Sequence, residues 1–395
     1  MSCRRRPYPT RHLSRTRSLR SVIFLSLATL LPTGDAGATL PSGSGALTRA
    51  GLTSDNVEYI GTIPLENGTW TTARLHDDHL YVSGNKSFTI FDVSTPQSPV
   101  FLSHTVTGFQ FINEDIDTNG EILLITDERV EGVLHIWDVS NKASPVKLAE
   151  VPDMIDHSFA CVFDCKWAYG AGGDIVDLRD PAHPKPAGRW ATPPPGFWGF
   201  DTTEGRPGMV VTASREIHFL DGRKQPADPN VLALAPGPAG EFVHSIQWPS
   251  RGHDRFLLVQ TETSPKPRCD ARSGAMITYD ASNWRKTHTF QPIDEFRPTA
   301  GMYADGKPAV SALGCSATWF KPHPSFHDGG LLAGAFFDHG TRFLEVSPQG
   351  KISEIGYYMP IGGSTTAALW ANDEIVYAID IVHGIDILRF TDAPN

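Results

Sequence analysis

Short runs of alternating apolar and polar residues follow one another along most of the chain, and Gly, Pro, Asn or Asp separates them. Alternation with a period of two is typical of a β-strand that packs on one face, and the separating residues favour turns. The segment from Leu80 to Asp92 contains two such runs, with a turn at Gly84 and Asn85 between them. The pattern predicts an all-β protein with little helix.

The segment from Leu80 to Val100 recurs in imperfect copies as strand, turn, strand and an Asp-x-Ser-x-Pro corner that leads into another strand. Seven copies align on the residue that closes the third strand, namely Asp92, Asp138, Asp177, Asp221, Asp280, Glu345 and Arg389. Their separations of 39 to 65 residues are those of four-stranded propeller blades with insertions in blades five and six. We therefore predict a seven-bladed β-propeller over residues 57–392.

The two ends of this repeat array complement each other. Val57–Ile63 resembles the fourth strand of the other copies, whereas the seventh copy stops after its third strand at Ile385–Phe390. Pairing of these strands would complete the last blade and remove the exposed edges of an open array. We expect the N-terminal strand to close the ring. The alternative is a disordered N-terminal strand and an open seventh blade.

The first 38 residues have a different composition from the rest. Seven arginines between Arg4 and Arg20 precede an apolar run from Val22 to Leu31, and small residues follow at Ala36–Ala38. This order is that of a secretory signal peptide, and the apolar run is short for a membrane span. We predict a signal peptide over residues 1–38, a flexible leader over residues 39–56, and a secreted or cell-envelope protein of bacterial origin without a transmembrane segment.

Loss of this leader makes the chain more acidic. It carries seven basic residues and one acidic residue, so its removal changes the formal net charge from −10 to −16. An acidic exported chain is a poor partner for nucleic acid or an anionic membrane, and we expect neither. The charge serves solubility or, alternatively, a cationic ligand.

Four cysteines follow the leader, and an even number in an exported chain suggests two disulfides. Cys269 and Cys315 fall in neighbouring insertions on the same predicted face, so a bridge between them is geometrically reasonable. Cys161 and Cys165 can pair only across a tight turn, because four residues of extended strand span about 13 Å. The spacing leaves this second pair open.

The first strand of each blade should surround a central channel, with the entering loops and the loops between strands two and three on one face. The alignment puts His157 and His244 at the mouth of that channel, where Glu114 and Asp115 could add a carboxylate. Converging imidazoles can bind copper, iron or zinc, or act as acid and base near neutral pH. Alternatively, both histidines cap loops by hydrogen bonding to the backbone.

Four further residues at the starts of channel strands are candidates for ligand contacts: Trp70, Phe111, Trp198 and Ser364. Large side chains also plug propeller channels, so packing is the alternative role of the aromatic residues. The sequence contains no Gly-x-Ser-x-Gly elbow, no His-Glu-x-x-His and no phosphate loop. No class of reaction is therefore indicated.

Residues 57–390 resemble the LVIVD-repeat family of exported bacterial proteins, on strands such as Phe88–Ser94 and Gly173–Asp177 and on the Pro corners that follow. The resemblance implies a seven-bladed propeller outside the cytoplasm and no settled activity. A more distant architectural likeness, to selenium-binding and methanethiol oxidase propellers with copper-binding channel histidines, serves as an analogy only.

The leading hypothesis is an exported binding module that receives a small molecule, glycan or protein on its loop-rich channel-mouth face. The alternative is a metal-dependent oxidase or tailoring enzyme that uses His157 and His244, with copper, iron or zinc as its cofactor.

Overall fold

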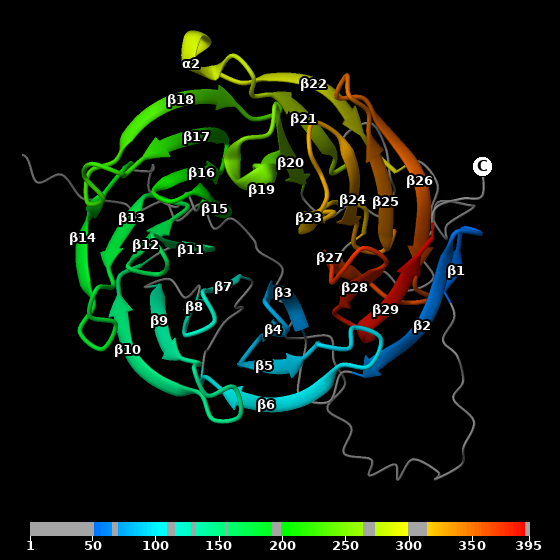
Figure 1. Ribbon diagram of the computed structural model, residues 1–395, viewed down its shortest axis with the longest axis horizontal. Helices are drawn as coiled ribbons and strands as arrows, with labels where there is room; N and C mark the ends of the chain where they lie inside the picture. The colour runs from blue at the N-terminus through cyan, green and yellow to red at the C-terminus, as the bar shows by residue number, and fades with distance from the viewer. Residues whose placement is uncertain are drawn as a thin grey trace, which may run out of the picture. The chain divides into compact units, whose positions relative to one another are not determined.

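Seven antiparallel sheets of the described residues stand around a common axis, which confirms the predicted seven-bladed propeller (Figure 1). The structure is a computed structural model and describes residues 51–64, 70–108, 115–127, 132–154, 156–191, 199–263, 273–298 and 314–391. All of them belong to the unit Thr48–Asn395. Helix in these ranges is limited to the short turns α1 (Pro249–Gly252) and α2 (Trp284–Thr287), neither long enough to cross a membrane.

In blades one to five, the strands follow one another outward from the axis in chain order (Figure 1). Blades one to three consist of β3 (Trp70–His76), β4 (His79–Gly84), β5 (Ser87–Asp92) and β6 (Val100–Val106); β7 (Ile116–Thr118), β8 (Ile122–Asp127), β9 (Val133–Asp138) and β10 (Val146–Pro152); and β11 (Phe159–Val162), β12 (Trp167–Gly170), β13 (Asp174–Asp177) and β14 (Lys185–Arg189).

Blades four and five consist of β15 (Asp201–Arg206), β16 (Met209–Ala213), β17 (Glu216–Asp221) and β18 (Asn230–Pro236), and of β19 (Phe242–Gln247), β20 (Phe256–Glu262), β21 (Met276–Asp280) and β22 (Gln291–Phe296). Blade six begins with β23 (Phe320–Pro322), β24 (Gly330–Ala335), β25 (Thr341–Val346) and β26 (Ile352–Met359), and blade seven with β27 (Thr365–Trp370), β28 (Ile375–Asp380) and β29 (Gly384–Phe390).

The N-terminal strand closes the ring, as the complementary ends of the repeat array predict. β2 (Val57–Pro64) is the outer strand of blade seven and pairs antiparallel with β29, from Val57 opposite Phe390 to Pro64 opposite Gly384. The preceding β1 (Leu52–Thr53) adds a fifth strand to blade six, with Leu52 opposite Met359. The N-terminal segment therefore joins two neighbouring blades.

The aspartate that ends the third strand forms a turn in blades one to five. Its Oδ1 accepts a hydrogen bond of 2.8 to 3.1 Å from the backbone N–H two residues later, at Asp92, Asp138, Asp177, Asp221 and Asp280. This Asx turn starts the corner that leads to the outer strand. The residue that makes the repeat visible in the sequence thus has a structural role.

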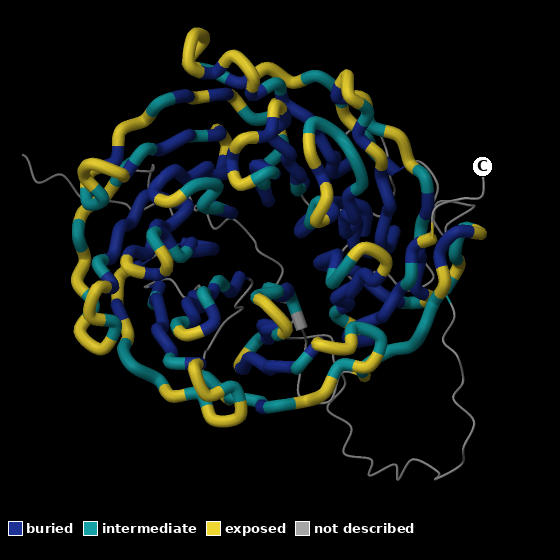
Figure 2. The backbone as a smooth tube through the Cα atoms, viewed as in Figure 1, coloured by how far each residue is buried: buried dark blue, intermediate teal, exposed yellow. Residues whose placement is uncertain are grey.

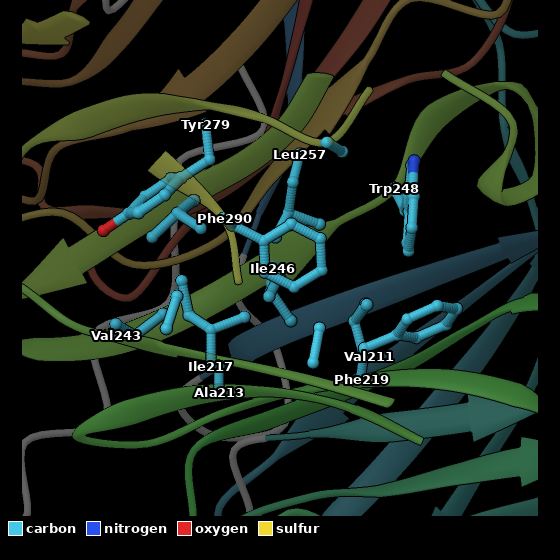
Figure 3. Close-up of a cluster of buried hydrophobic side chains, with 14 of the residues drawn as sticks. Val211, Ala213, Ile217, Phe219, Val243, Ile246, Trp248, Leu257, Tyr279 and Phe290 are labelled. Carbon is cyan, nitrogen blue, oxygen red and sulfur yellow. The ribbon is translucent and has the colours of Figure 1, made fainter. Parts of the chain in front are cut away.

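The hydrophobic core lies between neighbouring blades, and the exposed residues gather on turns and outer strands (Figure 2). Between blades four and five, Val211 and Phe219 face Ile246, Trp248 and neighbouring apolar side chains (Figure 3). The ring centroids of Phe219 and Trp248 are 4.8 Å apart in an edge-to-face contact. Such aromatic pairs stabilise a core beyond the area that they bury.

Candidate functional site

Two groups of polar side chains lie along the axis of the ring, near opposite ends of the inner strands. Because the inner strands of a propeller all run in the same direction, residues at their starts share one face and residues at their ends share the other. His157 and His244 belong to the starting ends of β11 and β19, whereas His76 and Asn119 stand at the far ends of β3 and β7.

The structure brings the two predicted histidines together. The ring centroids of His157 and His244 are 5.4 Å apart in an edge-to-face arrangement, and both side chains are buried. The rings of Phe200 and Trp319 lie 5.5 and 4.9 Å from His244. The pair is therefore part of an aromatic cluster that spans blades three to six.

Two acidic side chains lie near this histidine pair. Glu262 Oε2 is 3.6 Å from His244 Nε2, and the buried Asp201 carboxylate interacts electrostatically with His244. Within the described ranges, no third metal-ligating side chain is close enough to both imidazoles to complete a three-ligand site. Glu114, expected to add a carboxylate, lies outside the described residues.

The structure places two of the four predicted ligand-contact residues. Ser364 is fully buried before β27, and its carbonyl oxygen accepts a 3.1 Å hydrogen bond from the Ile381 N–H. Trp70 is the first residue of β3. Phe111 and Trp198 lie outside the described residues, so their contacts stay predictions. The sequence alignment did not single out Trp319, although it directly precedes the inner strand β23.

Cys161 and Cys165 form a disulfide, which resolves the pairing that the spacing left open. Their Cα atoms are 4.2 Å apart. Phe163, Asp164 and Cys165 have φ angles of 54°, 59° and 53°, so three consecutive left-handed residues make the tight turn. Cys315 is also disulfide-bonded, but the expected partner Cys269 lies outside the described residues, and that pair stays a prediction.

A charged cluster occupies the axis beyond the histidine pair. Arg74 on β3 forms an ion pair with Asp117 on β7 (Nε to Oδ1, 3.1 Å), and its guanidinium lies 3.9 Å from Asp115. Asp201 on β15 adds a buried carboxylate, and Lys321 on β23 adds an ammonium group whose charge interacts with Arg74 and Asp117. The inner strands of blades one, two, four and six therefore contribute to one electrostatic network.

Burial moves three of these groups towards neutral pKa values. Desolvation raises the pKa of Asp115 to about 7 against the opposing charge of Arg74. Desolvation also raises the pKa of Asp201 to about 6, although its Oδ2 accepts a 2.7 Å hydrogen bond from the Ile246 N–H. Desolvation lowers the pKa of Lys321 to about 8. The axis therefore holds groups that exchange protons near neutral pH.

A polar cavity of about 240 Å³ opens beside this cluster. Residues of blades one to four line it: Arg74, His76, Asp117, Thr118, Asn119, Cys161, Asp164, Thr203 and Glu204.

Hydrogen bonds between the blades hold the walls of this axial cavity. Asp117 Oδ2 accepts from the Cys161 N–H at 2.8 Å, and Glu204 Oε1 accepts from the Phe163 N–H at 2.9 Å. Asn119 Nδ2 donates to Asp164 Oδ1 at 2.9 Å. The disulfide-bonded turn is therefore fixed between the neighbouring blades, and the cavity is largely preformed.

We expect Asp115 and Asp201 to destabilise the fold as pH rises from 4 to 7. Their folded-state pKa values lie above the ordinary value of 3.8, so folding favours the protonated carboxyls. The stability that folding gains from the two protonated carboxyls is fully present below pH 3.8. It is lost as pH rises through 6 and 7, while Lys321 stays charged. Between pH 4 and 7, the free energy of unfolding of Asp115→Asn should fall less than that of the unsubstituted chain, by an amount on the order of 3 kcal/mol. Urea unfolding at several pH values measures it, and an unchanged pH slope in the variant would contradict the account.

The comparisons with known proteins concern the repeat and the fold. Residues 74–107 match the LVIVD repeat. No curated protein matches the sequence.

Several solved structures share the propeller fold. Raptor of Chaetomium thermophilum has a TM-score of 0.57 at 15% identity, and the match covers 85% of this chain. It covers 30% of the Raptor chain, so this chain spans under a third of the length of Raptor. The WD40 repeats of RRP9 have a TM-score of 0.56 at 9% identity, over 86% and 98% of the two chains. The Pseudomonas aeruginosa periplasmic gluconolactonase PpgL has a TM-score of 0.55 at 12% identity, over 76% and 88%. At these identities the likeness concerns the fold alone.

The matched repeat corresponds to blade one, since it runs from Arg74 on β3 to just beyond the end of β6. It contains the strand Phe88–Ser94 and the Asx turn at Asp92, on which the resemblance in the sequence rests. Blade one of this seven-bladed propeller therefore contains a match to the LVIVD repeat.

Proposed function

We propose that this LVIVD-repeat propeller is an exported binding protein that holds a small polyhydroxylated molecule in its axial cavity. One observation carries the proposal: the inner strands of four consecutive blades line a preformed polar cavity of about 240 Å³. A cavity of this volume lies below the usual range for drug-sized ligands, so a sugar-sized molecule fits it better.

The lining of the axial cavity favours ligands that donate hydrogen bonds. Asp117, Asp164 and Glu204 present carboxylate oxygens, while Arg74 and His76 supply donors. A carboxylate has about four acceptor positions, so these groups keep acceptor capacity beyond their backbone bonds. An apolar ligand would desolvate them without replacing the lost hydrogen bonds, which is costly. Hydroxyl groups both donate and accept, and therefore suit this mixture.

Two observations support the exported state. The Cys161–Cys165 disulfide is of a kind that persists mainly in oxidising compartments, and the first 38 residues have the composition of a signal peptide. The similar propeller of Pseudomonas aeruginosa is a periplasmic protein, which gives one example of this fold outside the cytoplasm.

The loop-rich channel-mouth face stays a second possible location for the ligand. The loops 109–114, 192–198, 264–272 and 299–313, which the sequence analysis assigns to that face, lie outside the described residues. A glycan or protein partner predicted there is therefore a separate proposal from a ligand in the axial cavity.

Titration calorimetry of the chain 39–395 with matched sugars, polyols, amines and dicarboxylates tests the axial site. We expect binding by polyols or sugars and none by dicarboxylates, which the lining carboxylates repel. Asp164→Asn should weaken binding at least about tenfold, by removing a charged acceptor (about 1.4 kcal/mol). His157→Ala, at the opposite end of the axis, should leave the affinity unchanged. If Asp164→Asn binds as tightly as the unsubstituted chain and His157→Ala loses binding, the ligand lies at the channel mouth instead.

A metal-dependent enzyme is the second candidate, and the proximity of the two buried imidazoles favours it. Two nitrogen ligands from His157 and His244 suit copper, iron or zinc, and Glu262 Oε2 lies 3.6 Å from His244 Nε2. Elemental analysis tests this function. Near-stoichiometric metal that disappears in His157→Ala and in His244→Ala supports it, and metal content that is unaffected by both substitutions rejects it.

A further inference from the structure

We propose that Asp380, His383 and Asp386 form a buried divalent-cation site at the junction that closes the ring. Asp380 ends β28, His383 lies in the following turn, and Asp386 lies on β29. The exposed fractions of the three residues are 0%, 6% and 1%. One potential ligand atom from each lies within 4.8 Å of the others.

The hydrogen bonding of His383 orients its ring for metal binding. Its Nε2 lies 3.0 Å from the carbonyl oxygen of Ile361, and a carbonyl can only accept, so this nitrogen carries a proton. The opposite nitrogen Nδ1 faces Asp386 Oδ2 at 3.5 Å, and this contact raises the pKa of His383. Metal-ligating histidines commonly donate their second ring N–H in this way, which turns the other nitrogen towards the ion.

The separation of the two ligand atoms also fits a shared ion. Two atoms that each lie about 2.1 Å from a tetrahedral ion are about 3.4 Å apart. The distance from His383 Nδ1 to Asp386 Oδ2 is 3.5 Å. An ion therefore fits between these atoms with little movement of either side chain.

Neighbouring donors position both carboxylates without neutralising their charge. Asp380 Oδ1 accepts from the backbone N–H groups of Val382 and His383 at 2.8 and 2.9 Å. Asp386 accepts from the hydroxyls of Tyr358, at 3.0 Å, and Thr62. Asp386 and Asp380 raise the pKa of His383, but one protonated imidazole balances only one of the two buried carboxylates, and a buried charge that stays uncompensated is costly.

The mixture of one nitrogen and two carboxylate ligands suits Zn²⁺ or Mn²⁺, and leaves a coordination position for water. A second group, Asp254, His327 and Asp328, is also close enough to share an ion. There His327 Nδ1 is hydrogen-bonded to the Ser250 hydroxyl at 2.9 Å, and His327 is exposed. That group therefore lacks a buried imidazole such as the one of His383.

The position of the site predicts that metal binding stabilises the closed ring. Thr62 on β2 and Tyr358 on β26 both hydrogen-bond to Asp386 on β29. The proposed ion would therefore brace the place where the N-terminal strand meets the last two blades. A ligand that binds only the folded state raises its stability in proportion to the logarithm of the ligand concentration.

The test uses the chain 39–395, stripped with EDTA and then dialysed against ZnCl₂ or MnCl₂. We expect close to one equivalent of bound metal by elemental analysis, and a rise in Tm of about 3 to 5 °C at a hundredfold excess over Kd. His383→Gln should lose both the metal and the Tm response, whereas His157→Ala should keep both. Asp380→Asn, which leaves the imidazole in place, should give the same loss as His383→Gln.

Several results would overturn the site. Less than about a tenth of an equivalent of metal, with a Tm indifferent to EDTA, would mean that the three residues form only a buried ion-pair network. Metal lost in His157→Ala but retained in His383→Gln would assign the ion to the other histidines. If His383→Gln does not fold, metal content and EDTA response of the unsubstituted chain and of Asp380→Asn decide the question.

Discussion

A chain that begins at residue 65 is expected to lose most of its stability, because it lacks both N-terminal strands. β2 pairs along the whole of β29, and its Ile60 and Ile63 pack against the core between blades seven and one. Removal of β2 would expose β29 as an edge strand. We expect a loss on the order of 5 kcal/mol or more, comparable with the total stability of many domains. Thermal unfolding by circular dichroism and size-exclusion chromatography measure it.

A chain that begins at residue 51 is the matched control for this truncation. It keeps β1 and β2 and removes only residues outside the described ranges. Its Tm should lie within about 2 °C of the Tm of the chain 39–395. A cooperative transition at the same temperature in the chain that begins at residue 65 would show that blade seven is stable without its outer strand.

Arg74→Met is expected to be the most damaging single substitution along the axis. Arg74 contacts Asp115 and Asp117, and its Nε also donates to the Ile116 carbonyl at 3.2 Å. Methionine fills a similar volume but leaves these carboxylates without their cation. Breaking a fully buried ion pair on one side typically costs about 3 to 5 kcal/mol, and because the side chains of Arg74 and Asp117 are 22% and 17% exposed, we expect a loss at the lower end of this range. Urea unfolding at pH 7 measures the loss, and a loss below about 1 kcal/mol would mean that water screens the cluster.

Two variants identify the cause of that loss. Arg74→Met combined with Asp117→Asn should recover part of the free energy of unfolding, because the second substitution removes one of the unpaired charges. Arg223→Met is the control on the surface. Arg223 forms an ion pair of 2.7 Å with Asp221, but its side chain is 54% exposed, so we expect no measurable change in the free energy of unfolding.

The fold could be predicted from the sequence because its determinants are local and repeated. The Asx turn depends on one aspartate and the backbone two residues later, so each of blades one to five carries its own marker, as at Asp92 and Asp138. Ring closure could be predicted because Val57–Ile63 has the pattern of the strand that the seventh copy lacks. The pairing of Leu52–Thr53 with β26 could not, since two residues are too few to show a period.

Only part of the candidate sites could be predicted from the sequence, and there are physical reasons why the rest could not. His157 and His244 could be brought together because both stand at the start of an inner strand. Arg74 and Lys321 are single charged residues in strands far apart in the sequence, and alternation does not tell which charged side chain turns towards the axis. One signal was present at Asp115 and Asp117, where two carboxylates two residues apart occur on a strand that should be buried.

The remaining features depend on conformations that the residue pattern does not encode. The Cys161–Cys165 disulfide needs three consecutive left-handed residues, none of which is glycine. His383 lies in the turn between β28 and β29, just before Gly384. Its proximity to Asp386 arises from the hairpin, and the hydroxyl of Thr62 reaches the same carboxylate only through closure of the ring.

The most direct test of the proposed binding function is a crystal structure of the chain 39–395 with the tightest-binding polyol from the calorimetric titrations. We expect electron density for the ligand in the axial cavity, in contact with Arg74, Asp164 and Glu204. Density beside His157 and His244 instead, with the axial cavity holding water alone, would contradict the proposed binding site.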